Sequence, residues 1–189
     1  MPTDTKGNDI TYVDIPVDGQ LWIGPSTVPV MAKTDLMLPT LVVPNTLTPL
    51  GLLTTDGGPE WGTDGVGDAT EFFQEGYSLP GMGGYYTLQV TAAQNQPFVN
   101  QLLNGVAFDQ DGYREVDQIS NANVYTVLSQ VIYKSGRIRR NMSNNVMVSE
   151  GSRAKEERPN VTGTELTFKW QPMSNGVYFN EALISPASA

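Results

Sequence analysis

Strict alternation of apolar and polar residues predicts a β-strand at residues 164–171. Its apolar face carries Leu166, Phe168 and Trp170, and polar side chains occupy the positions between them. A similar alternation over 85–91 predicts a second strand with one buried and one solvated face. Less regular patterns predict a first strand at 20–24, a strand at 124–134 that turns into a return strand at 137–148, and a closing strand around 178–183.

One stretch of the chain has helical character. Residues 95–105 read NQPFVNQLLNG, in which apolar residues recur four positions apart. Pro97 suits the first helical turn, Gly105 suits the end, and Asn95 is placed to cap the beginning. We expect one short helix lying on a sheet, because an isolated helix of this length is marginal in water.

Three segments lack a consistent apolar face and are expected to lie outside the sheet. Residues 1–19 predict an N-terminal arm, 54–70 an acidic glycine-rich loop, and 149–163 an exposed arm. A chain of 189 residues supports one hydrophobic core, so we expect a single domain over 1–189. The expected fold class is mainly β: a β-sandwich or barrel-like sheet with one short flanking helix and long loops or arms.

Charge is distributed unevenly along the chain. Residues 1–111 contain thirteen acids and two bases, whereas 112–189 contain seven acids and nine bases, for a net charge of −9. If the two regions lie at opposite poles, copies attract one another head to tail, and such contacts propagate into rings or filaments. The alternative is two unrelated solvated surfaces. The inter-subunit candidates are Asp56, Glu60, Trp61, Asp64 and Asp68 in the acidic part, and Lys134, Arg137, Arg139, Arg140, Arg153, Lys155 and Arg158 in the basic part.

Composition argues against enzymatic chemistry. The chain has no Cys and no His, which removes the thiol nucleophile, the commonest general base and the usual transition-metal ligands. Glu71 and Glu75 share one strand face, but residues four apart on a strand lie about 13 Å from each other, too far for a local acid–base pair. The acidic loop departs from a calcium-binding loop, because Gly58, Gly62 and Val66 stand where oxygen ligands are needed. We expect no catalytic residue, no metal and no cofactor.

The same composition limits the partners. The N-terminal residues lack the pattern of a signal peptide, and no window approaches about 18 consecutive apolar residues, so we expect no membrane partner. A net charge of −9 argues against wrapping nucleic acid, which needs clustered Lys and Arg. A surface that repels DNA can itself serve a function, because DNA does not adhere to it.

Several segments together carry a resemblance to a known family. They are GQLWIGPSTVPVMA, LGLLTTDGGPEWGTDGVGDATEFFQEG, YYTLQVTAAQNQPFVNQLLNG, VYTVLSQVIYKSGRIRRNM, SEGSRAKEER and ELTFKWQP. Together they resemble the major tail protein, or tail tube subunit, of long non-contractile-tailed phages, particularly those of actinobacteria. The sequence departs from the family at GYSLPGMGG, where an aromatic and basic strand is often found.

The resemblance implies a structural virion protein without enzymatic activity. Such subunits form hexameric rings that stack into a tail tube, assembled in the host cytoplasm, through which DNA passes transiently and without sequence preference. The implied partners are further copies and the tail terminator, tail tip and tape measure proteins. An acidic lumen would keep DNA from adhering. The segments 54–70 and 149–163 would connect subunits, and the lumen-facing candidates are Glu71, Glu75, Thr87, Gln89 and Glu165.

Other functions remain open. A head–tail joining protein or an injection-system tube protein would share the fold, and a joining protein would stop at one ring. A glycan-binding tail module would instead stack sugars on Tyr85, Tyr86 and Trp61. Trp61 is also a candidate anchor in a partner subunit, because its glycine-rich surroundings in the sequence offer it no local core neighbours.

Overall fold

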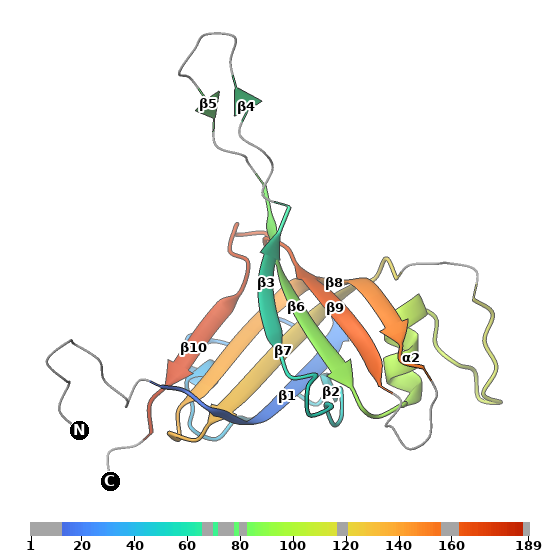
Figure 1. Ribbon diagram of the computed structural model, residues 1–189, viewed down its shortest axis with the longest axis horizontal. Coiled ribbons are helices and arrows are strands. Elements are labelled where there is room, and N and C mark those ends of the chain that lie inside the picture. Colours follow the sequence, from blue (N-terminus) through green and yellow to red (C-terminus); the bar gives the residue numbers. More distant parts are fainter. Residues whose placement is uncertain are drawn as a thin grey trace, which may run out of the picture.

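The main sheet is antiparallel throughout. The computed structural model describes residues 13–65, 70–71, 78–79, 83–116, 121–155 and 163–186. Within this part the strand order is β2–β1–β7–β8–β9–β6–β3, and β10 also pairs with β8 (Figure 1). The strands are β1 (Pro16–Pro25), β2 (Thr48–Pro49), β3 (Glu60–Asp64), β6 (Tyr85–Ala92), β7 (Val124–Tyr133), β8 (Ile138–Arg153), β9 (Thr164–Trp170) and β10 (Asn180–Ile184).

The mainly-β class predicted from the sequence is confirmed. The predicted helix is present as α2 (Pro97–Asn104), and a second helix, α1 (Lys33–Leu36), was not predicted. A separate strand pair, β4 (Thr70–Glu71) with β5 (Ser78–Leu79), is drawn apart from the main sheet in Figure 1. Glu75 and the rest of the strand expected after Thr70 lie outside the described residues.

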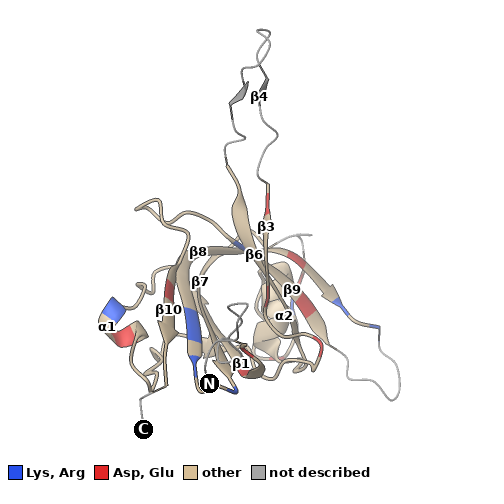
Figure 2. Ribbon diagram, turned by 60° about the vertical axis from the view of Figure 1, so that its left-hand side comes forward, with Lys and Arg blue, Asp and Glu red and all other residues tan. Residues whose placement is uncertain are grey.

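Strand β8 joins the two halves of the sheet. Along one edge it pairs with β7, from Ile132↔Ile138 to Val124↔Met147. Along its other edge it pairs first with β10 and then, from Val146 onward, with β9. The two halves therefore share one continuous strand, and the sheet curls around an interior (Figure 2).

The interior of the curled sheet holds the principal core. Residues from strands that are distant in the sheet order meet here, with Leu21 of β1, Leu88 of β6 and Phe168 of β9 fully buried. The period-two pattern recognised in β6 and β9 supplies the inward face of that half. The other members are Ile23, Leu50, Val90, Ala92, Val99, Leu102, Tyr125, Val127, Val146, Val148, Leu166 and Trp170.

A second core lies on the opposite face of β1, β7 and β8. The segment between β1 and β2, which includes α1, folds over this face; we call it the flap (residues 26–47). It buries Leu36 and Leu47 against Leu128 and Met142. The sheet is therefore covered on both faces at β7, and residues 125–129 are buried without alternation. This is why the sequence of β7 shows no regular alternation of apolar and polar residues.

The N-cap of helix α2 lies one residue later than the sequence predicted. Gln96 is the N-cap residue and makes no side-chain capping bond, whereas Asn95 Oδ1 accepts a hydrogen bond of 2.6 Å from Asn100 Nδ2. The assignment of Asn95 as the cap was therefore wrong. Gly105 ends the helix as predicted, in the left-handed conformation with φ of 76°.

The three expected arms are shorter than their sequence patterns suggested. Residues 16–19 belong to β1, because β7 extends far enough to pair with Pro16. Residues 60–64 of the acidic segment form β3, paired with β6, and residues 149–153 continue β8 along β9. Backbone pairing with a neighbour stabilises these strands although their exposed side chains give no apolar pattern. Residues 1–12, 66–69 and 156–162 lie outside the described part.

Two glycines with positive φ provide a matched test of the turn after α2. A Cβ at Gly105 would lie 2.9 Å from Asn121 Oδ1, whereas one at Gly112 (φ 81°) would meet nothing within 4 Å. Gly112→Ala should cost about 1 kcal/mol for left-handed strain alone. Gly105→Ala should cost more, because Asn121 must also shift from its bonds to Leu102 O and Tyr125 Oη. Urea unfolding measures the free energy of unfolding of both variants. Equal losses of stability would show that Asn121 moves aside without cost.

Candidate lumen and assembly surfaces

The outer surface of β8, β9, β6 and β3 is a continuous polar face. The strand registers place its side chains in rows across the sheet, for example Glu60, Gln89, Thr167 and Glu150. Neighbouring rows bring Thr87 beside Lys169 and Thr91 beside Glu165. We call this surface the polar face; its members are Glu60, Gly62, Asp64, Tyr85, Thr87, Gln89, Thr91, Met147, Glu150, Ser152, Glu165, Thr167 and Lys169.

Three of the five predicted lumen-facing residues lie together on the polar face. Thr87 and Gln89 come from β6 and Glu165 from β9, and Gln89 Nε2 donates a hydrogen bond to Glu165 Oε1. Glu71 is placed elsewhere, in β4, and Glu75 lies outside the described residues. The sequence prediction omitted Glu150 and Lys169, although alternation in 164–171 already placed Lys169 on the side of Glu165.

The charges of the polar face are predominantly negative. Its described members include four carboxylates, from Glu60, Asp64, Glu150 and Glu165, and one ammonium, from Lys169. The Lys169 Nζ lies 3.6 Å from the centroid of the Tyr85 ring, and the Tyr85 hydroxyl donates a 3.0 Å hydrogen bond to Asp64 Oδ2. That hydrogen bond is the main cause that raises the pKa of Tyr85, with smaller contributions from burial and from nearby negative charge.

Arg140 does not belong to a docking surface. Its side chain is 1% exposed and lies under the flap. The guanidinium donates to Gln130 Oε1 at 2.8 Å, to Leu36 O at 2.8 Å, to Leu38 O at 2.5 Å and to Pro39 O at 3.2 Å. Burial lowers the pKa of Arg140. Its prediction as an inter-subunit residue was wrong, because its register in β8 directs it to the flap-covered side of the sheet.

The other predicted bases are dispersed rather than gathered in one patch. Arg137 forms an ion pair of 3.1 Å with Asp14, which holds the residues before β1 beside the β7–β8 turn. Arg153 donates to Asn100 Oδ1 on α2. Lys134 and Lys155 are exposed, and Arg158 lies outside the described residues. The structure thus divides the basic run 134–140 among separate local contacts.

Arg139 lies on β8 opposite Leu183 of β10 and lines a groove at the open side of the curled sheet. Its Nε lies 3.5 Å from Glu181 Oε1, yet the same atom is buried and makes no hydrogen bond with a described residue. Arg139 and Glu181 therefore form a weak ion pair, whose atoms are close but do not have hydrogen-bond geometry. The guanidinium also lies 5.8 Å from the Tyr133 ring centroid.

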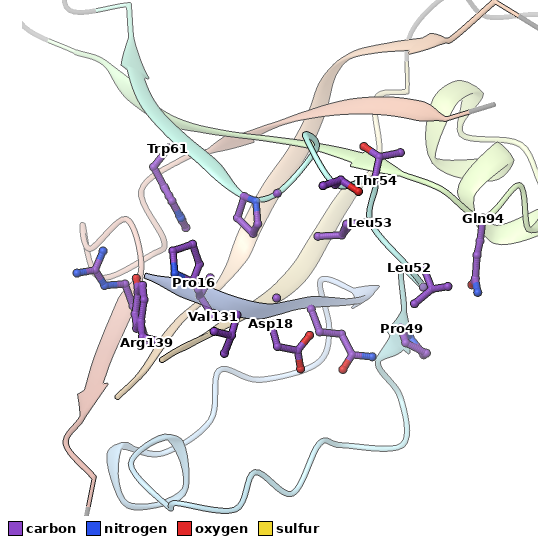
Figure 3. A pocket seen from close by; sticks show the side chains of 18 of the residues that line it. Pro16, Asp18, Pro49, Leu52, Leu53, Thr54, Trp61, Gln94, Val131 and Arg139 are labelled. Carbon is purple, nitrogen blue, oxygen red and sulfur yellow. The ribbon is translucent and has the colours of Figure 1, made fainter. Parts of the chain in front are cut away.

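A groove of about 720 Å³ opens beside Arg139, between β1 and the segment that leads into β3. Figure 3 shows Trp61, Pro16 and Arg139 at one end of the groove and Gln94 at the other. Trp61 lies 4.9 Å from Trp170 and 5.3 Å from Phe179 between ring centroids. Trp61 has no core neighbours close to it in sequence, as expected, but β3 pairs it with Leu88 on the inward face, so its ring packs within its own chain.

The acidic candidates fall into two groups. Glu60 and Asp64 are exposed on the polar face, whereas Asp56 is exposed in the turn that precedes β3. Asp68 lies outside the described residues. Among the residues described, no group of three or more acidic side chains is arranged to hold a metal ion. No helix within the same residues is both long and apolar enough to cross a membrane.

No protein-family model matches this sequence, and no curated protein is significantly similar to it.

Replacing Arg140 tests whether its buried bonds hold the flap. Arg140→Met leaves three backbone carbonyls and Gln130 without their donor, so we expect unfolding free energy to fall by about 3 kcal/mol. The control Lys134→Met removes the same charge at an exposed position and should change stability by less than about 0.5 kcal/mol. Chemical denaturation compares them, and similar losses would contradict a clamping role for Arg140.

Proposed function

We propose that this protein is a structural subunit that assembles into rings, that the rings stack into a phage tail tube, and that the polar face lines the conduit for DNA. The observation that carries the proposal is the composition of that face: hydroxyls, the Gln89 amide and four carboxylates lie on a sheet surface with one ammonium among its described members. The acids come from three strands, β3, β8 and β9, and the outward side chains of β6 between β3 and β9 are uncharged.

The physical argument concerns phosphate adhesion. A wall with clustered cations would release counterions from DNA and bind it tightly, which would oppose sliding. A wall of carboxylates has no such driving force, and its neutral Thr and Gln side chains hold water without adding positive charge. The polar face therefore suits a surface along which a polyanion moves without sticking.

The strand edges support assembly with further copies. Strand β3 has no second partner among the described residues, and β2 covers β1 only at Trp22 and Ile23. Residues 16–20 of β1, which line the groove, therefore also form a strand edge that β2 does not pair with. Unpaired strand edges can pair with the backbone of another chain. Such pairing could join copies of a subunit that polymerises.

The glycan-binding alternative is less well supported by the geometry. Tyr85 lies on the polar face, while Tyr86 and Trp61 point to the opposite side of the sheet and pack in an aromatic cluster with Phe179. These three rings do not form one exposed platform for a sugar. A joining protein of the same fold remains the alternative, and polymer length distinguishes it from a tube subunit.

Negative-stain electron microscopy of the purified, concentrated protein is the direct test. The tube proposal predicts hollow filaments built from stacked rings, with light scattering giving masses far above that of one 20.6 kDa chain. Single rings that never stack would favour a joining protein. A monomer that stays monomeric when added to preformed tail tips would contradict the proposal.

Reversing charge on the polar face tests the lumen assignment. Glu60→Lys with Glu150→Lys should leave tube formation intact but make the tubes retain labelled duplex DNA, measured by co-sedimentation, because clustered cations release counterions. The matched control, Asp111→Lys with Glu115→Lys, makes the same charge change in the loop after α2 and should retain no DNA. Loss of tubes only in the first variant would place the polar face in a subunit contact instead.

A further inference from the structure

The polar face contains one cation among its described residues, and that cation lies against an aromatic ring. Lys169 is directly opposite Thr87 in the pairing of β9 with β6, so its backbone position is in the middle of the face. It makes no ion pair with a described carboxylate; its ammonium instead lies 3.6 Å from the Tyr85 ring centroid. An ammonium at this distance over an aromatic face is attracted by the ring's negative quadrupole.

The Tyr85 ring is itself held from two sides. Its hydroxyl donates to Asp64 Oδ2, and Asp64 Oδ1 accepts a 2.6 Å hydrogen bond from the backbone N–H of Gly65. Gly65 has φ of 72°, and a Cβ there would lie 2.9 Å from Tyr85 Cε1. The backbone of Gly65 therefore packs close to the ring, at a position where a side chain would both collide and strain the backbone. These contacts fix the orientation that the ring presents to Lys169.

We propose that Tyr85, oriented by Asp64 and Gly65, is a shielding residue that holds the Lys169 ammonium away from DNA phosphates. This inference rests on the proposed function, since it assigns a role to residues of the same conduit wall. A lysine extended from the middle of the wall would offer each passing phosphate a point of adhesion, repeated in every subunit. The ring competes with a phosphate for the ammonium, and Asp64 holds the ring in place for that contact.

The arrangement separates two properties of Lys169. Its aliphatic stem covers sheet surface between β6 and β9, which long amphipathic side chains do well. Its ammonium, in contrast, lies against the Tyr85 ring. The shield explains how a lysine is compatible with a wall whose other charged members in the described part are carboxylates.

The first experiment measures the shield directly. Trace acylation of the intact protein by an amine-reactive ester, followed by mass spectrometry, gives the modification rate of Lys169 relative to exposed Lys134. Tyr85→Leu should raise this ratio about two- to fivefold, the factor that corresponds to an exposed cation–π contact. Tyr85→Phe keeps the ring and should leave most of the protection. The control Tyr113→Leu removes an exposed tyrosine elsewhere and should not change the ratio.

The second experiment measures the consequence for DNA. Fluorescence anisotropy of a labelled duplex should show binding to Tyr85→Leu, weakening about three- to fourfold per contacting subunit between 50 and 200 mM salt, as one phosphate contact requires. The double variant Tyr85→Leu with Lys169→Met should lose that binding. The shielding role would be overturned if Tyr85→Leu left the acylation rate of Lys169 unchanged, or if this variant bound DNA no better than the protein with Tyr85.

The outcomes separate this inference from the proposed function. Tubes that form normally while Tyr85→Leu gains no DNA binding would reject the shield and leave the tube proposal standing. A protein that forms no tubes under any condition, but whose Tyr85→Leu variant gains Lys169-dependent DNA binding, would reject the tube and leave the shield as a property of the face.

Discussion

The rest of the structure depends on the pairing of β8, which uses both of its edges and both of its faces. One edge binds β7, and the other binds β10 and β9 in succession. Inward side chains such as Val146 enter the principal core, while outward ones such as Met142 enter the second core beneath the flap. A strand saturated in this way has no freedom to slip, because a shift by one residue would exchange its two sets of side chains.

Alternation predicted the strands whose two faces meet different environments. In β6 and β9 one face is buried and the other solvated, so the sequence itself reveals both the strand and its orientation. The same rule is silent for β7, whose residues 125–129 are buried on both sides, and for the ends of β1, β3 and β8, which are held by backbone pairing. The pattern of apolar and polar residues reports where side chains lie. The ends of β1, β3 and β8 are set by main-chain hydrogen bonds, which leave no such pattern.

The candidate surfaces were predictable to a similar extent. Gln89, Thr87 and Glu165 were grouped correctly on one face because alternation fixes parity within β6 and β9, and the register then aligns the strands. The basic run at 134–140 was misleading, because adjacent residues of a strand point to opposite sides and a cluster in sequence is divided in space. Arg140 enters the interior of the protein and Arg139 the mouth of the groove, while Arg137 reaches back to Asp14.

This division of the arginines affects how free subunits behave toward one another. Arg137 is paired with Asp14, Arg139 is partly compensated by Glu181, and Arg140 is enclosed among acceptors of its own chain. The charge visible to an approaching copy is therefore more uniformly negative than the linear sequence implies. Like-charged particles stay dispersed, with repulsion that acts over a Debye length of about 8 Å at physiological salt. Under the proposed function, this repulsion would slow association of free copies at low concentration and favour growth on a template that already holds the first layer.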